Sequence, residues 1–299
     1  MKKIILTVAL LILSVFVLAA CTQQKAISDS LKRGWDVNLQ TLKYDIFETE
    51  QENGADIKRL IGEMSVTMQR FDKTDVKIND KELKGFSGYK TSYFITMSDG
   101  GKAVEIDSQA IFAGTKMKPQ YSYKSVTVDG TLLYEITAAY TAKNYEYSLT
   151  QNGETPKSGK IKLKGTYFDN EMIFALLRTC PLEDRGSSFD FAFSVPSVLD
   201  DTSGFVDMKI VNAEGSSVKY KREDRTEKDG YTDADFVIGV DDALHFKYVP
   251  AQDLDYNGMT EMFYAKTNDL LFDKKETYIP VYIKQNNIEY IFYQAEETK

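Results

Sequence analysis

Apolar and polar residues alternate along most of this chain, a pattern that predicts β-strands with one buried face. Leu42, Tyr44 and Ile46 share one parity, and the alternation continues to about Phe71. Further strands are expected at residues 86–97, 103–112, 121–128, 132–140, 145–149, 161–163, 189–195, 205–211, 218–221, 236–240, 244–249, 278–283 and 288–293. Residues 262–272 fit a helix and a strand equally well.

Short turn sequences separate these segments. Asn53-Gly54, Asp99-Gly100, Asp129-Gly130 and Asn152-Gly153 each stand between two alternating runs. Asn-Gly and Asp-Gly pairs adopt the positive φ angles that two-residue hairpin turns need. The expected topology is therefore a meander of antiparallel strands.

One segment departs from the period of two. Residues 166–178 contain good helix formers, with acidic residues early and Arg178 late, and Pro181 follows. This order predicts a helix, which we extend to Thr179. Its apolar residues surround most of the helix axis, so we expect it to be buried on more than one side.

These elements predict a mainly β fold with a minor α component. We expect a curved antiparallel sheet or half-barrel, either one sheet or two related sheets, wrapped on the helix near residues 166–179. The β-rich domain would span residues 31–299, and its two halves would be residues 31–165 and 183–299. With 299 residues in the chain, size permits one large domain or two ordinary ones.

The first residues predict a secretory signal. Lys2 and Lys3 precede an apolar run at residues 4–18, and Leu18-Ala19-Ala20-Cys21 follows. This order resembles a bacterial lipobox, which implies cleavage before Cys21 and attachment of lipid to its sulfur. The apolar run is short for a bilayer core, which needs about 20 residues. We therefore expect an extracytoplasmic protein, lipid-anchored to a bacterial membrane, with residues 1–20 as signal peptide and residues 21–30 as tether.

The charge balance argues against nucleic acid as a partner. Without Lys2 and Lys3, 35 basic side chains face 45 acidic ones, a net charge of −10. Such a chain repels phosphate backbones unless it carries a dense basic patch, and none is present in the sequence. If lipid occupies Cys21, Cys180 has no partner for an intrachain disulfide, and its apolar surroundings favour a packing role.

Short motifs around the predicted helix resemble a family of exported bacterial β proteins of unknown function. The motifs are Tyr167-Phe168-Asp169-Asn170-Glu171, Leu176-Leu177-Arg178 and Pro181-Leu182, with Pro119-Gln120-Tyr121-Ser122-Tyr123 upstream. Members look like half-open barrels of the lipoprotein-carrier type, in which a curved sheet wraps an apolar groove and a helix acts as plug or lid. The resemblance implies no catalytic residues. Met172, Phe174 and Leu177 are the candidate groove residues, and core packing is their alternative role.

Few residues offer catalytic or metal chemistry. His245 is the one histidine of the chain, and strand alternation predicts a surface position for it, opposite in facing to Leu244 and Phe246. No H-E-x-x-H motif, cysteine pair, G-x-S-x-G elbow or phosphate-binding glycine loop is present. A weak calcium candidate comprises Asp253, Asp255, Asn257 and Glu261, but Tyr264 occupies the twelfth position, where a calcium loop has glutamate.

These observations favour non-catalytic binding of an apolar or amphipathic ligand, with no cofactor other than the lipid on Cys21. The first alternative is a structural or protein-interaction lipoprotein of the cell envelope. The second is a hydrolase that uses two carboxylates, because acidic residues are abundant and spacing excludes no pair. A cleft with two carboxylates and a raised pKa on one would favour the hydrolase.

Overall fold

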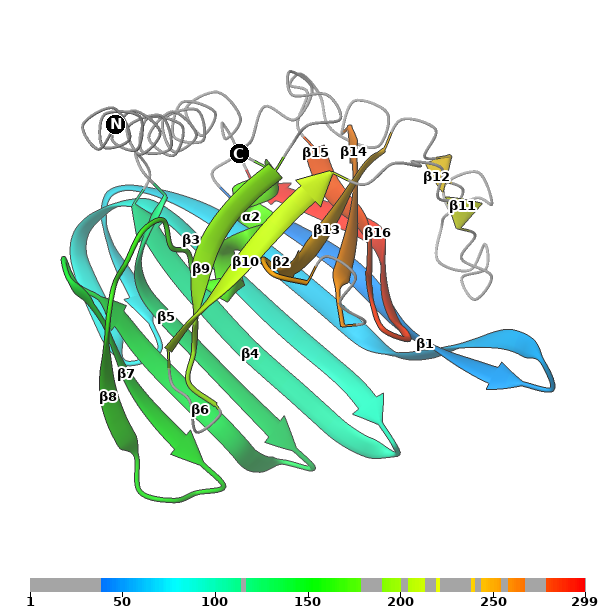
Figure 1. Ribbon diagram of the computed structural model, residues 1–299, viewed down its shortest axis with the longest axis horizontal. Helices are drawn as coiled ribbons and strands as arrows, with labels where there is room; N and C mark the ends of the chain where they lie inside the picture. The colour runs from blue at the N-terminus through cyan, green and yellow to red at the C-terminus, as the bar shows by residue number, and fades with distance from the viewer. Residues whose placement is uncertain are drawn as a thin grey trace, which may run out of the picture.

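A computed structural model describes residues 39–113, 117–178, 190–199, 204–212, 219–220, 238–239, 243–253, 258–266 and 278–298. Within these residues the protein is mainly β, as predicted (Figure 1). Fourteen of the described strands form one sheet, which is antiparallel throughout. The alternative of two related sheets is therefore wrong, because strands from both halves of the chain join this one sheet.

The first eight strands form an unbroken meander. They are β1 (Leu39–Glu52), β2 (Ala55–Ile78), β3 (Lys81–Asp99), β4 (Lys102–Ala113), β5 (Lys118–Val128), β6 (Thr131–Tyr140), β7 (Asn144–Gln151) and β8 (Lys157–Lys162). Each pairs with the next, as the short turns predict. At Asn152-Gly153 the φ angles are 49° and 73°, so both residues adopt the left-handed conformation of a two-residue hairpin turn.

The second half of the chain extends the same sheet from its other side. It contributes β9 (Asp190–Ser197), β10 (Gly204–Asn212), β13 (Leu244–Pro250), β14 (Thr260–Lys266), β15 (Tyr278–Gln285) and β16 (Ile288–Thr298). The strand order is β8-β7-β6-β5-β4-β3-β2-β1-β16-β15-β14-β13-β10-β9, so the last strand pairs with the first. The ambiguous segment at 262–272 is thus a strand where it is described. A separate pair, β11 (Lys219–Tyr220) and β12 (Ile238–Gly239), lies outside this sheet.

The sheet curls but does not close, and β8 and β9 are its two edges (Figure 1). A short stretch after β8 contacts β9 across the gap. The Phe168 N–H donates to the Ser194 carbonyl at 3.0 Å, and the Ser194 N–H donates to the Thr166 carbonyl at 2.9 Å. This isolated parallel bridge connects the two ends of the sheet.

The helical segment is shorter than predicted. A 3₁₀ turn, η1 (Asn170–Met172), leads into α2 (Ile173–Arg178). The prediction of a helix beginning at Thr166 is wrong, because residues 166–168 are not helical and the backbone groups of Thr166 and Phe168 bond to Ser194 on β9. Asp169 ends this stretch, with φ −89° and ψ 143°, and its carboxylate accepts from the Glu171 N–H. Thr179 lies outside the described residues.

The helix α2 is drawn behind β9 and β10 in the view of Figure 1. Met172, Ala175, Leu176 and Leu177 have no exposed surface and belong to the main hydrophobic core, together with residues of β1, β2, β13, β14, β15 and β16. Burial on more than one side thus agrees with the apolar pattern around the helix axis.

Candidate functional site

A cavity of about 610 Å³ lies between the helical segment and the strands around it. Its walls combine residues from both halves of the sheet. Much of the lining is apolar, as in Met64, Ile95, Ile136, Val195, Met208 and Met262. Small-molecule sites occupy roughly 300–1,000 Å³ and are mostly apolar with a few convergent polar groups, and this cavity fits both criteria.

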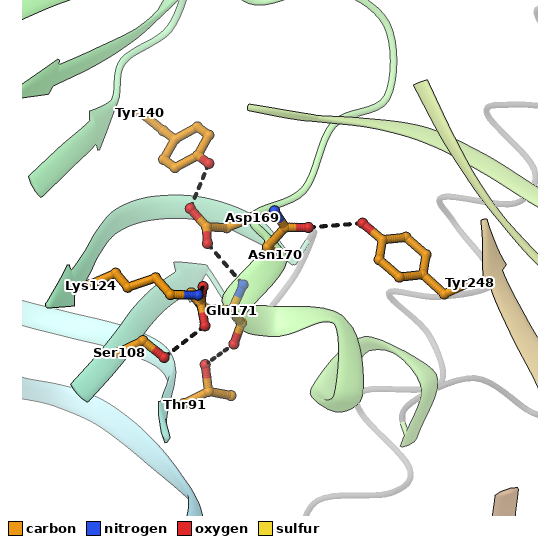
Figure 2. A network of polar contacts seen from close by, with 8 residues as sticks. All are labelled: Thr91, Ser108, Lys124, Tyr140, Asp169, Asn170, Glu171 and Tyr248. Atoms are coloured by element: carbon orange, nitrogen blue, oxygen red, sulfur yellow. Dashed lines mark hydrogen bonds and ion pairs between the residues drawn. The ribbon is translucent and has the colours of Figure 1, made fainter. Parts of the chain in front are cut away.

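Three consecutive polar residues at the start of the helical segment also line the cavity: Asp169, Asn170 and Glu171. Figure 2 shows that each binds a side chain from a different strand. The chain places them together because Asp169 caps the 3₁₀ turn and fixes the two residues that follow it.

Asp169 is almost fully buried, with 4% of its surface exposed. The Tyr140 hydroxyl donates to Oδ2 at 2.7 Å, and the Glu171 N–H donates to Oδ1 at 3.0 Å. Burial, followed by the charge of Glu171, raises the pKa of the Asp169 carboxyl above its usual range. Burial and the charge of Asp169 likewise raise the pKa of the Tyr140 hydroxyl.

Glu171 joins the helical segment to three strands. Lys124 Nζ lies 2.9 Å from Oε1, the Ser108 hydroxyl donates to Oε2 at 2.7 Å, and the Thr91 hydroxyl donates to the Glu171 carbonyl at 2.8 Å (Figure 2). The Glu171 carboxylate raises the pKa of Lys124 above its usual value, and this effect outweighs the opposite effect of burial. Lys124 is therefore a fixed positive charge in the cavity wall.

Asn170 completes the polar cluster on the side of the second half of the chain. Its Oδ1 accepts from the Tyr248 hydroxyl at 2.8 Å. Burial, and then the charge of Glu171, raises the pKa of that hydroxyl, so Tyr248 stays protonated and able to donate. The polar cluster, comprising Asp169, Asn170, Glu171 and Lys124, thus lies between the two halves of the sheet.

The predicted groove residues divide between cavity and core. Phe174 lines the cavity, where its ring packs against that of Tyr93 with centroids 5.8 Å apart. Met172 and Leu177 are fully buried and do not line the cavity. Their alternative role, core packing, matches these positions.

The calcium candidate stays a prediction. Asp255 and Asn257 lie outside the described residues, Asp253 is exposed, and Glu261 lies on β14. Within the described part of the chain, no cluster of three or more histidine, cysteine or acidic side chains is placed to hold a metal ion.

His245 is not a surface residue, so that prediction is wrong. It is 8% exposed, its ring stacks on Phe263 with centroids 4.0 Å apart, and its Nε2 lies 3.3 Å from Glu261 Oε2. Alternation placed it correctly on the face opposite Leu244 and Phe246. The aromatic neighbour from β14 covers it there.

The lipidation candidate Cys21 and the tether lie outside the described residues, as does Cys180. Among the residues that are described, no helix is long and apolar enough to span a membrane.

Comparison with solved structures finds a similarity in fold. No protein-family model matches the chain, and no curated protein matches it. The crystal structure of a β-barrel-like protein of a domain of unknown function, DUF1849, from Brucella abortus is similar, with a TM-score of 0.49 and 10% sequence identity. The similarity covers 88% of this chain and 99% of the Brucella chain.

Proposed function

We propose that this protein is a lipid-anchored extracytoplasmic protein that binds an apolar or amphipathic small molecule, without catalysis, in the cavity beside α2. The observation that carries the proposal is the cavity of about 610 Å³, with apolar walls and a polar cluster on one side. Ile173 and Phe174 of the helical segment line this cavity.

The energetics favour an acyl chain or similar apolar body. Each methylene group moved from water into such a cavity contributes about 0.8 kcal/mol. A chain that buries about ten of them contributes roughly 8 kcal/mol before the costs of immobilising the ligand. The tail would contact the apolar walls, and the head would lie at the polar cluster.

The edge of the cavity is also apolar, which suits a ligand taken from a membrane. Leu199 and Val206 both line the cavity and are 46% and 42% exposed. A lipid on Cys21 would hold this edge near the bilayer, where amphiphiles are concentrated. The net charge of the chain gives nucleic acid no role in this proposal.

A carboxylate hydrolase is the second candidate, because Asp169 and Glu171 line one cavity and the pKa of Asp169 is raised. However, both oxygens of each carboxylate already accept hydrogen bonds or ion pairs from the protein. Asp169 also serves as the cap of η1. These contacts favour a structural role for Asp169 over proton transfer to a substrate.

The binding proposal is tested by native mass spectrometry of the chain from residue 21, with Cys21→Ser to remove the covalent lipid. We expect a stoichiometric small-molecule adduct after gentle purification, identifiable by extraction. Ile136→Trp places bulk in the cavity and should abolish the adduct. Leu133→Trp is the matched control on the same strand, because Leu133 is 43% exposed and does not line the cavity.

A protein without adduct that also takes up no member of a lipid panel would contradict the proposal. It would favour the envelope structural or interaction role. An adduct that survives Ile136→Trp unchanged would place the ligand elsewhere.

A further inference from the structure

The two carboxylates that line the cavity are fully engaged by donors of the protein itself. Asp169 Oδ1 and Oδ2 accept from the Glu171 N–H and the Tyr140 hydroxyl. Glu171 Oε1 and Oε2 accept from Lys124 and Ser108. Each of the four carboxylate oxygens already has a donor within the protein.

Several donors around the cavity, in contrast, retain capacity. Tyr93 lines the cavity, is 5% exposed, and its hydroxyl has no hydrogen-bond partner among the described residues. Tyr134, Tyr145 and Tyr290 line the same cavity, and within the described part of the chain no hydrogen bond engages their hydroxyls. The Lys124 ammonium carries three N–H donors and has one carboxylate partner there, Glu171.

An unsatisfied buried donor is costly, so buried tyrosine hydroxyls usually find an acceptor. The Tyr93 hydroxyl is such a buried donor, and three further tyrosines and the Lys124 ammonium line the same cavity, so the arrangement suits a ligand that supplies acceptors. Carbonyl, ester and hydroxyl oxygens all meet this requirement, and so would a carboxylate or a phosphate.

Charge distinguishes between these acceptors. Lys124 is the one cationic side chain among the residues that line the cavity, and Glu171 neutralises it at 2.9 Å. Asp169 adds a second carboxylate nearby, so the polar cluster offers an anionic head no net positive charge. A cationic head would have to compete with Lys124 and the other donors for carboxylate oxygens that are already engaged.

We infer that the ligand is an amphiphile with an uncharged head rich in acceptor oxygens, of the acylglycerol class, whose ester and hydroxyl oxygens accept from the cavity tyrosines and Lys124. This inference rests on the proposed function and adds the chemistry of the head group. The acyl chain would lie against the apolar walls near Phe174 and Met208.

The test compares three probes that share one acyl chain length: a monoacylglycerol, the fatty-acid anion and an alkyltrimethylammonium. Each is titrated calorimetrically, below its micelle concentration and near neutral pH, into the mature chain carrying Cys21→Ser. We expect the monoacylglycerol to bind about tenfold or more tightly than either ion. Equal or tighter binding of an ion overturns the inference and leaves the proposed function standing. Failure of all three probes to bind contradicts the proposed function itself.

A double variant tests the assigned donors. Tyr134→Phe with Tyr290→Phe removes two hydroxyls and keeps both rings, so the cavity retains its shape. We expect the monoacylglycerol affinity to fall about fivefold or more, and the alkyltrimethylammonium affinity to stay the same. Tyr293→Phe is the control, because Tyr293 lies on β16 and does not line the cavity. An unchanged monoacylglycerol affinity in the double variant would refute the role of these hydroxyls.

Discussion

Asp169 organises the polar cluster, and replacing it with alanine should reveal how much stability its two carboxylate oxygens provide. Loss of the cap of η1 costs about 1 kcal/mol. The Tyr140 hydroxyl, which donates to Oδ2 at 2.7 Å and belongs to a residue that is 7% exposed, would lose its acceptor at a cost of about 1–3 kcal/mol. The two effects together predict a loss of about 2–4 kcal/mol.

Asp169→Asn is the reference variant, because it removes the charge of Asp169 but keeps the cap and the partner of Tyr140. Asparagine is also uncharged, yet it caps helical turns well and keeps a polar partner for the Tyr140 hydroxyl. Urea unfolding should therefore show Asp169→Ala about 2–4 kcal/mol less stable than Asp169→Asn. In a Tyr140→Phe background the difference should shrink to the cap contribution of about 1 kcal/mol. Equal stabilities of the alanine and asparagine variants in the presence of Tyr140 would refute the reasoning.

Three further predictions concern pH, the core and one turn. Burial raises the pKa of Asp169 in the folded state, so the folded protein binds more protons than the unfolded chain above about pH 4. This contribution to stability is lost as the pH rises through the pKa of Asp169 in the folded protein. Over that pH range, the free energy of unfolding of Asp169→Asn should therefore increase relative to that of the unmodified protein. A difference that stays constant with pH would contradict the raised pKa. Leu176→Ala should cost about 2–5 kcal/mol in urea unfolding, because Leu176 is fully buried in the main core; a cost below about 1 kcal/mol would contradict its core position. Gly153→Ala should lower thermal stability, because φ is 73° there, and an unchanged melting temperature would contradict the turn geometry.

The strands could be predicted because alternation and turn residues are local features of the sequence. Leu42, Tyr44 and Ile46 alternate with less buried or polar neighbours, and all three are buried in the core. The turn at Asn152-Gly153 follows from residues that tolerate positive φ. β16 pairs with β1, so the last described strand contacts the first, and no local pattern indicates such a contact.

The beginning of the helix could not be predicted from local signals. Thr166 and Phe168 are compatible with a helix, but their backbone groups bond to Ser194 on β9 instead. A contact between residues so distant in sequence overrides helix propensity. Asp169 carried the informative signal, since aspartate is among the residues preferred at the N-cap.

The candidate site was predicted only in part, because local patterns do not show which residues face the cavity. The helix pattern could not separate Phe174, which lines the cavity, from Met172, which is buried in the core, because both are apolar. Lys124 was missed because alternation assigns β5 two faces without indicating which one the helix covers. Lys124 and Ser122 lie on the same face of β5, and that face is directed at the helical segment rather than at solvent.

The most direct test of ligand binding is a crystal structure of the mature chain carrying Cys21→Ser, grown with a monoacylglycerol that bears bromine at the end of its acyl chain. Anomalous scattering locates the bromine without any assumption about the ligand. The proposal predicts bromine density within the cavity, against Phe174 and Met208, with the glycerol oxygens near Lys124 and Tyr134. A structure with this cavity empty, or with the bromine bound elsewhere on the sheet, would contradict it.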